Sequence, residues 1–119
     1  MPYELTYLSG GLLKLLEIDN NAQHWLAGAA SGHVLGRWRT DIGLLGRIVI
    51  LRDFENTEDL LDERRRALLS SNPFNGNGIV EEISQESYQD FEFLPPAVPG
   101  VYGGVYEIRI HTAYIRPKE

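Results

Sequence analysis

Two strand patterns joined by a glycine-containing connection, between Gly32 and Phe54, constrain the fold of this chain most. In residues 33–40, Val34 and Trp38 alternate with Arg37 and Arg39, so the period of two places the two pairs on opposite sides of a strand. Residues 41–46 contain two glycines, which accept positive φ without penalty and suit a turn. Residues 47–54 include a β-branched apolar run, typical of a strand covered on both faces. We expect a β-hairpin.

Two helices and two further strands are predicted around this hairpin. Residues 3–8 alternate tyrosine and leucine with polar residues, which indicates a strand. Residues 11–30 carry an apolar stripe at helical spacing, with Ser9 as the expected N-cap and Gly32 at the left-handed position after the helix. Residues 57–71 follow the capping residue Asn56 and stop before a proline, which predicts the second helix. Residues 79–94 read as a long, mostly polar strand.

The order strand, helix, strand, strand, helix, strand predicts an α+β fold of the ferredoxin-like, split βαβ class, with an antiparallel sheet and both helices on one face. The other face would carry Trp38, Val34 and Tyr7. These are more large apolar side chains than a solvated sheet face tolerates, so we expect a second subunit to cover it in a twofold homodimer with the sheets face to face.

Prolines and glycines near the end of the sequence indicate where the domain ends. We expect one domain over residues 1–94 and a connector over 95–104, where Pro95-Pro96, Pro99-Gly100 and Gly103-Gly104 interrupt regular structure. Residues 105–119 contain a fifth strand pattern. Its tyrosine, glutamate and aliphatic opening at Tyr106 repeats the opening at Tyr3, so this segment resembles the start of a second copy of the domain.

Charge and composition narrow the classes of partner. The formal net charge of −6 opposes binding to phosphate backbones, so we expect no nucleic-acid partner. No apolar segment approaches the roughly 20 residues that cross a bilayer, which predicts no membrane insertion. The N-terminus lacks the basic region of a signal peptide, and we expect a cytoplasmic protein. The absence of cysteine excludes disulfides and thiolate chemistry.

The hairpin resembles a known family. Gly36-Arg37-Trp38-Arg39-Thr40-Asp41-Ile42-Gly43, followed by Arg47-Ile48-Val49, is similar to the tryptophan-containing hairpin of NIPSNAP domains. Asn72-Pro73 at the end of the second helix fits the same family. The chain departs from it at Gly46, where the family usually has asparagine, and at Ile50-Leu51-Arg52, where the family has a run like His-Leu-Trp. The resemblance implies a dimeric α+β barrel, commonly of unassigned biochemistry.

The candidate ligand site combines an indole with guanidinium groups and would suit a planar or carboxylated small molecule, through stacking and bidentate hydrogen bonds. Its candidate residues are Trp38, His33, Tyr7, Arg37, Arg39 and Arg47. An alternative stays open, in which Trp38 belongs to the core or to the dimer interface and the arginines are solvated or paired with acids. The acidic residues between Glu81 and Glu92 are more simply interpreted as a solvated face.

Two functions remain open from the sequence. The first is a NIPSNAP-like dimer that acts as a small-molecule-binding or protein-interaction module. The second is a cofactor-independent enzyme similar to the monooxygenases of the dimeric α+β barrel superfamily, with a cavity between helices and sheet lined by Trp38, His33, Tyr7 and Arg37. The three histidines lack the spacing of a metal site, so we expect no metal and no cofactor.

Overall fold

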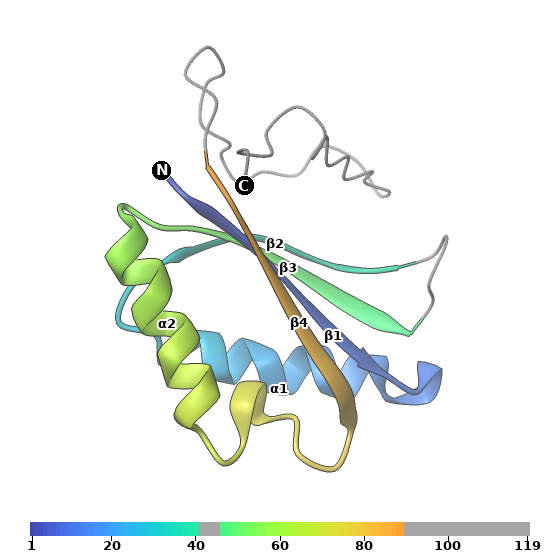
Figure 1. The fold of residues 1–119 in the computed structure, drawn as a ribbon. Coiled ribbons are helices and arrows are strands. Elements are labelled where there is room, and N and C mark those ends of the chain that lie inside the picture. The colour runs from blue at the N-terminus through green and yellow to red at the C-terminus, as the bar shows by residue number, and fades with distance from the viewer. Residues whose placement is uncertain (41–45, 90–119) are drawn as a thin grey trace.

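A computed structural model of the chain describes residues 1–40 and 46–89. These residues form a four-stranded antiparallel sheet with two helices packed on one face (Figure 1). The elements in chain order are β1 (Tyr3–Gly10), a 3-10 turn η1 (Leu12–Lys14), α1 (Leu15–Ala27), β2 (His33–Arg39), β3 (Arg47–Asp53), α2 (Thr57–Leu69), a 3-10 turn η2 (Pro73–Asn75) and β4 (Val80–Tyr88). The predicted α+β class, the element order and the hairpin are confirmed.

The strands lie in the order β2-β3-β1-β4, so β1 and β3 are central and β2 and β4 form the borders. The register places Trp38, Val49, Tyr7 and Ser84 in one row across the four strands. The next row in the same direction on the sheet contains Gly36, Leu51, Leu5 and Glu86. Side chains in these two rows point away from the helices, because their neighbours Leu8, Ile48 and Ile50 belong to the core beneath α1.

Helix α1 is shorter than the sequence predicts. Ser9, expected to cap it, lies within β1, and the chain enters α1 through η1 without a capping side chain. Three members of the predicted apolar stripe, Leu15, Ala22 and Leu26, are buried together with Ile18, whereas the fourth, Ala29, lies beyond the end of the helix. Gly32 has a φ of +95°, as expected for a left-handed position after the helix.

Helix α2 starts where the sequence predicts. The side chain of Asn56 accepts a hydrogen bond from the backbone N–H of Asp59 at 2.8 Å, which satisfies a donor that the first helical turn leaves without a partner. The helix ends at Leu69, ahead of Pro73. No helix in the described part of the chain is long and apolar enough to cross a membrane.

A β-bulge in β2 changes which side chains share a face. Val34 pairs with Arg52 and Gly36 pairs with Leu51, so Leu35 is the extra residue. Val34 therefore packs against the core under the helices, while Trp38 points to the other face. The prediction that Val34 and Trp38 lie on one side was wrong, because one inserted residue reverses the alternation.

The predicted fourth strand is observed as β4 from Val80 to Tyr88. Its proposed continuation beyond 89, the connector at 95–104 and the fifth strand at 105–119 lie outside the described residues, as do residues 41–45 of the hairpin connection.

Candidate functional site

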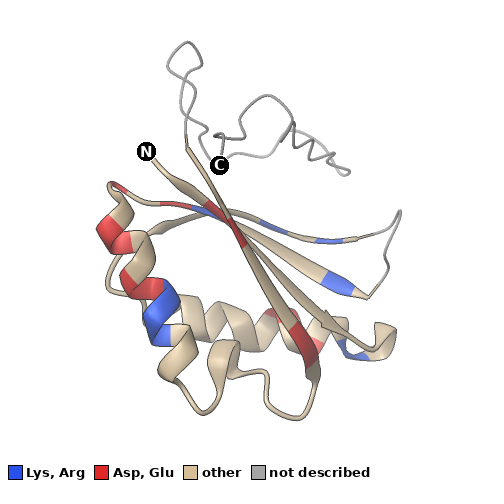
Figure 2. Cartoon of the chain, viewed as in Figure 1, with Lys and Arg blue, Asp and Glu red and all other residues tan. Residues whose placement is uncertain are grey.

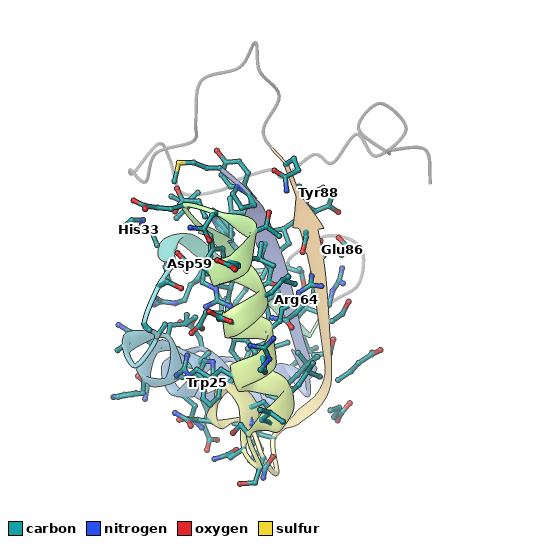
Figure 3. The ribbon with its side chains drawn as sticks, turned by 60° about the vertical axis from the view of Figure 1, so that its left-hand side comes forward. Trp25, His33, Asp59, Arg64, Glu86 and Tyr88 are labelled. Atoms are coloured by element: carbon teal, nitrogen blue, oxygen red, sulfur yellow. The ribbon has the colours of Figure 1, made fainter. Side chains whose placement is uncertain are left out.

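The face of the sheet opposite the helices, called the helix-free face below, carries a hydrogen-bonded cluster of two tyrosines and one carboxylate. Tyr88 donates to Glu86 Oε1 at 2.7 Å, and Tyr7 donates to the same oxygen at 3.5 Å. The three residues meet because Tyr7 and Glu86 lie diagonally across the β1–β4 pair, while Glu86 and Tyr88 are two positions apart on one strand. Glu86 and Tyr88 lie near the end of β4 (Figure 3).

Both tyrosines are held in the neutral form. Burial, followed by the hydrogen bond and the charge of Glu86, raises the pKa of Tyr88 above its ordinary value of 10.0. Burial raises the pKa of Tyr7 as well, with the charge of Glu86 adding to the effect and the charge of Arg47 opposing it. Both phenols therefore act as hydrogen-bond donors throughout the physiological range.

Arg47 and Tyr7 form a cation–π pair on this face. The guanidinium carbon lies 4.5 Å from the centre of the Tyr7 ring, within the range of an attractive contact with the ring's electron-rich face. The Nε atom of Arg47 is buried and donates to no acceptor among the described residues. The tyrosine ring therefore already interacts with one cation inside the chain.

Trp38 lies flat along β2 because its neighbour is a glycine. A Cβ atom on Gly36 would stand 2.3 Å from the Cζ2 and Cη2 atoms of the indole, far inside van der Waals contact. Only glycine therefore allows the ring to cover position 36. One face of the indole is against the backbone of β2, and the ring spans both rows defined above.

The structure divides the six predicted site residues into three groups. Trp38, Tyr7 and Arg47 share the helix-free face. His33 is exposed at the start of β2, where its Nδ1 lies 3.3 Å from Asp53 Oδ1. The other two arginines of β2, described next, point to the face that the helices cover.

Arg37 and Arg39 alternate with Trp38 and therefore leave its face. Arg37 Nε donates to Asp19 Oδ1 of α1 at 2.8 Å, which ties β2 to the helix layer. Arg39 is exposed at the end of β2, opposite Ile48 of β3. The pairing of Arg37 with an acid corresponds to the alternative that the sequence left open for these arginines.

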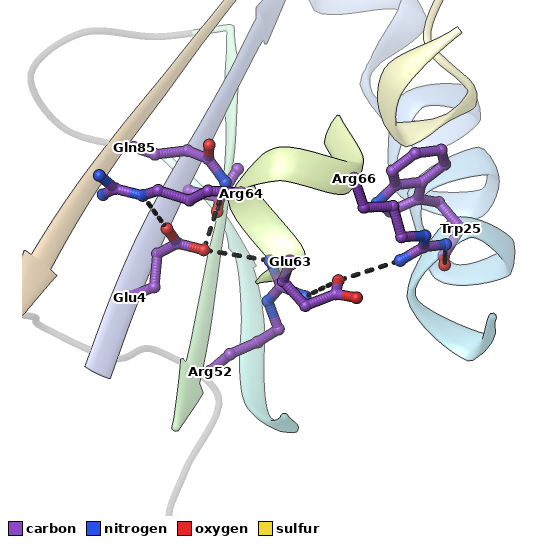
Figure 4. Close-up of polar contacts among 8 residues, drawn as sticks. Glu4, Trp25, Arg52, Glu63, Arg64, Arg66 and Gln85 are labelled. Carbon is purple, nitrogen blue, oxygen red and sulfur yellow. Dashed lines mark hydrogen bonds and ion pairs between the residues drawn. The ribbon is translucent and has the colours of Figure 1, made fainter. Parts of the chain in front are cut away.

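Sequence reasoning missed a buried network of charges between α2 and the sheet (Figure 4). Arg52 of β3 is at its centre and donates to Glu63 Oε1 at 2.9 Å and to Glu4 Oε1 at 3.1 Å. The three side chains are between 0% and 4% exposed, so their charges are almost completely removed from water. The only signal in the sequence was Arg52 itself, a charge that directly follows an apolar strand core.

Five more residues surround this network. Arg64 Nε donates to Glu4 Oε2 at 2.5 Å, and Gln85 Nε2 donates to Glu4 and to Thr6 at 3.2 Å each. Arg66 donates to Glu63 at 3.0 Å and to the backbone oxygen of Trp25 at 2.6 Å. Its guanidinium carbon also lies 3.9 Å from the Trp25 ring centre. The middle and the C-terminal half of α2 are thus connected to the rest of the domain by charged side chains.

Comparison of sequences gives no relative, since no protein-family model and no curated protein matches this chain. Comparison of structures does identify similar proteins. A NIPSNAP domain protein from Burkholderia xenovorans, 16% identical, superimposes with a TM-score of 0.61 over 81% of this chain and 100% of the other. A NIPSNAP-like domain protein from the same organism, 22% identical, has a TM-score of 0.60 over 86% of this chain and 94% of the other.

This chain has the fold of NIPSNAP domains. A candidate antibiotic biosynthesis monooxygenase from Nitrosomonas europaea, 12% identical, is also similar but at a lower TM-score of 0.54, over 76% of this chain and 98% of the other. At these identities the likeness concerns the fold, and function is argued from the residues.

In this NIPSNAP fold, the layer between helices and sheet does not hold the residues that an enzyme cavity there was expected to use. Trp38 and Tyr7 point away from it, and His33 is exposed at its margin. Arg37 does point toward the helices, but it is paired with Asp19. At the α2 end the layer is filled by the charge network around Arg52.

A shallow depression of about 260 Å³ lies elsewhere, between η2 and β4, and is lined by Pro73, Gly76, Asn77, Val80, Glu81, Glu82 and Ile83. It is not beside Trp38. Within residues 1–40 and 46–89, no three His, Cys, Asp or Glu side chains converge as a metal site requires. The cluster on the helix-free face is therefore the best candidate site of this NIPSNAP fold.

Proposed function

We propose that the chain is a NIPSNAP-like domain that works as a twofold homodimer, with the two helix-free faces turned toward each other, and that it is a binding module for a small molecule held between them. The observation that carries this proposal is the composition of that face. It combines the indole of Trp38, the ring of Tyr7 with its Arg47 partner, and a carboxylate that accepts from two neutral tyrosines.

The apolar centre of the face supports the same proposal. Leu5 and Val49 occupy the middle of the two central strands, where they are 2% and 6% exposed within the single chain, and the half-buried Leu51 lies beside them. Antiparallel sheets that face water on one side usually alternate apolar residues toward the core with polar residues toward the solvent, which is not the pattern here. Two such faces packed about 10 Å apart would share one apolar interior.

Sedimentation velocity at roughly 10 µM tests the dimer, a concentration at which an interface of ordinary size is occupied. The wild-type protein is expected to sediment at twice its chain mass of 13.5 kDa. Trp38→Glu would place a charge in the interface and is expected to give a folded monomer. Leu13→Glu, at a residue of η1 that is 99% exposed, serves as the control and should remain dimeric.

A wild-type monomer, or a Trp38→Glu protein that stays dimeric with an unchanged circular dichroism spectrum, would contradict the proposal.

A further inference from the structure

The two borders of the sheet differ in charge on the helix-free face. Border strand β4 presents Glu82 and Glu86 there, whereas border strand β2 presents Trp38 and Gly36, because Arg37 and Arg39 point to the face that the helices cover. Figure 2 shows the basic positions along β2 and acidic positions on β4. This distribution decides how two copies can meet, given the twofold dimer proposed above, on which the following inference rests.

Two orientations of the twofold axis bring the helix-free faces together. An axis perpendicular to the strands places β4 on the partner's β4, so that Glu82 and Glu86 approach their own copies. An axis parallel to the strands instead places the partner's Trp38 and Gly36, which carry no charge, along the acidic β4. Because juxtaposed like charges cost several kcal/mol, the charges favour the parallel axis.

The register then specifies which side chains meet. Rotation about an axis parallel to the strands preserves the rows of the sheet, so the partner's Trp38 comes to the level of Ser84 and its Gly36 to the level of Glu86. The largest side chain on the face meets an exposed serine, and because the indole covers Gly36, it also reaches the level of Glu86. Within one protomer, by contrast, β3 and β1 separate Trp38 from the Tyr7–Glu86–Tyr88 cluster.

We infer that the two protomers build a composite site for an organic cation, in which Glu86, Tyr7 and Tyr88 come from one chain and the indole comes from the partner's Trp38. The class of ligand follows from the chemistry of the walls. The faces of indole and phenol rings attract cations, most strongly quaternary or methylated ammonium groups, and repel anions. Glu86 supplies the counter-charge, already oriented by two phenol donors.

The remaining charges of the face agree with a cation. Glu82 and Glu86 on β4 and Asp53 on β3 are acidic, with Asp53 lying 3.3 Å from His33, whereas Arg47 is the arginine of the strand rows and covers Tyr7. A carboxylated ligand, which the sequence suggested, would need Arg37 and Arg39, and these point to the opposite face. The dimer should therefore select positively charged organic molecules.

Isothermal titration with benzyltrimethylammonium tests the ligand class. Wild-type dimer is expected to bind this probe, and Glu86→Gln and Trp38→Leu should each weaken binding by about tenfold, the size of a partly desolvated cation–π contact. Glu58→Gln, at an exposed acid of α2, is the matched control and should bind as the wild type does. No binding by the wild type at about 10 mM probe, or full affinity in either site variant, would overturn the assignment.

Subunit mixing tests whether the site is shared. Trp38→Leu and Glu86→Gln chains are unfolded together in urea and refolded, so that half of the dimers become heterodimers. If the partner supplies the indole, each heterodimer regains one intact site, and about a quarter of all sites bind with wild-type affinity. If each chain binds alone, mixing restores none, although sedimentation still shows a dimer. That result would refute the composite site and leave the proposed dimer standing.

Discussion

The buried network between α2 and the sheet gives the sharpest test of how this fold is held together. Arg52→Leu removes a side chain that is 2% exposed and donates to two carboxylates that are themselves almost fully buried. Each hydrogen bond to a charged group contributes about 1.5–3 kcal/mol. The loss of two such bonds is about 3–6 kcal/mol, which overlaps the 3–5 kcal/mol typical of breaking a buried ion pair.

Urea unfolding followed by circular dichroism at pH 7 measures this loss. A domain of 119 residues has a total stability of roughly 6–18 kcal/mol. With a dependence on urea of about 2 kcal/mol per molar, a loss of about 4 kcal/mol lowers the midpoint by about 2 M. Arg65→Leu on the same helix is the control, because its ion pair with Asp62 is 66% and 65% exposed and contributes less than about 1 kcal/mol.

A third variant distinguishes the loss of charge pairing from the cost of keeping charges away from water. Replacing Glu4, Arg52 and Glu63 together by leucine removes the charges that must be desolvated, while Arg64 and Arg66 are about 30% exposed and can reach water. Buried ion networks exchanged for apolar residues usually leave stability unchanged or increase it. The triple variant should therefore unfold close to the wild-type midpoint. A single variant that loses less than about 1 kcal/mol, or a triple variant as weak as the single one, would refute the reasoning.

Three other outcomes follow from the structure. Gly32→Ala should lower the free energy of unfolding by more than about 1 kcal/mol, because φ is +95° and a Cβ atom would stand 2.6 Å from Phe54. Gly78→Ala is the control in the same urea assay, because Gly78 has a φ of +89° but open space around it, so this variant shows the cost of the backbone conformation alone. The unfolded chain releases phenol protons before the folded one does, so stability should decline as the pH rises above 10, and Tyr88→Phe should make that decline shallower when unfolding is compared at pH 9 and pH 11. Asn56→Ala should lower stability by about 1 kcal/mol through loss of the α2 cap, and an unchanged midpoint would show that the cap contributes nothing.

The sequence predicted most accurately what depends on neighbours along the chain. The hairpin, the start of α2 at Asn56 and the buried stripe of α1 follow from local spacing and capping, and all three are observed. The Leu35 bulge was not predicted, because its position depends on how β2 pairs with β3. It moved Val34 to the core and left Trp38 on the other face.

The site was predictable only in part, because its side chains meet through strand pairing between residues that are far apart in the chain. Trp38, Tyr7 and Arg47 were recognised as candidates by residue type, and the structure places them on one face. Glu86 was interpreted as part of a solvated acidic strand, since its bond to Tyr7 joins residues 79 positions apart. The partners of Arg52 are similarly distant, at 48 positions for Glu4, and no local pattern indicates such pairs.

The bulge at Leu35 also bears on how this surface could diverge over evolutionary time. Deleting that one residue would restore simple alternation with every other side chain on its present face, because Val34 and Gly36 already lie on opposite faces and pair with adjacent residues of β3. A gain or loss of one residue between Gly36 and Arg39, with the bulge kept, would instead turn over one end of the strand and place an arginine where the indole now lies. The bulge is therefore a place where the length of β2 can change by a single codon without changing either surface. Homologues that lack Leu35 are expected to keep the binding surface, whereas homologues with a length change elsewhere in β2 are expected to differ in what they bind.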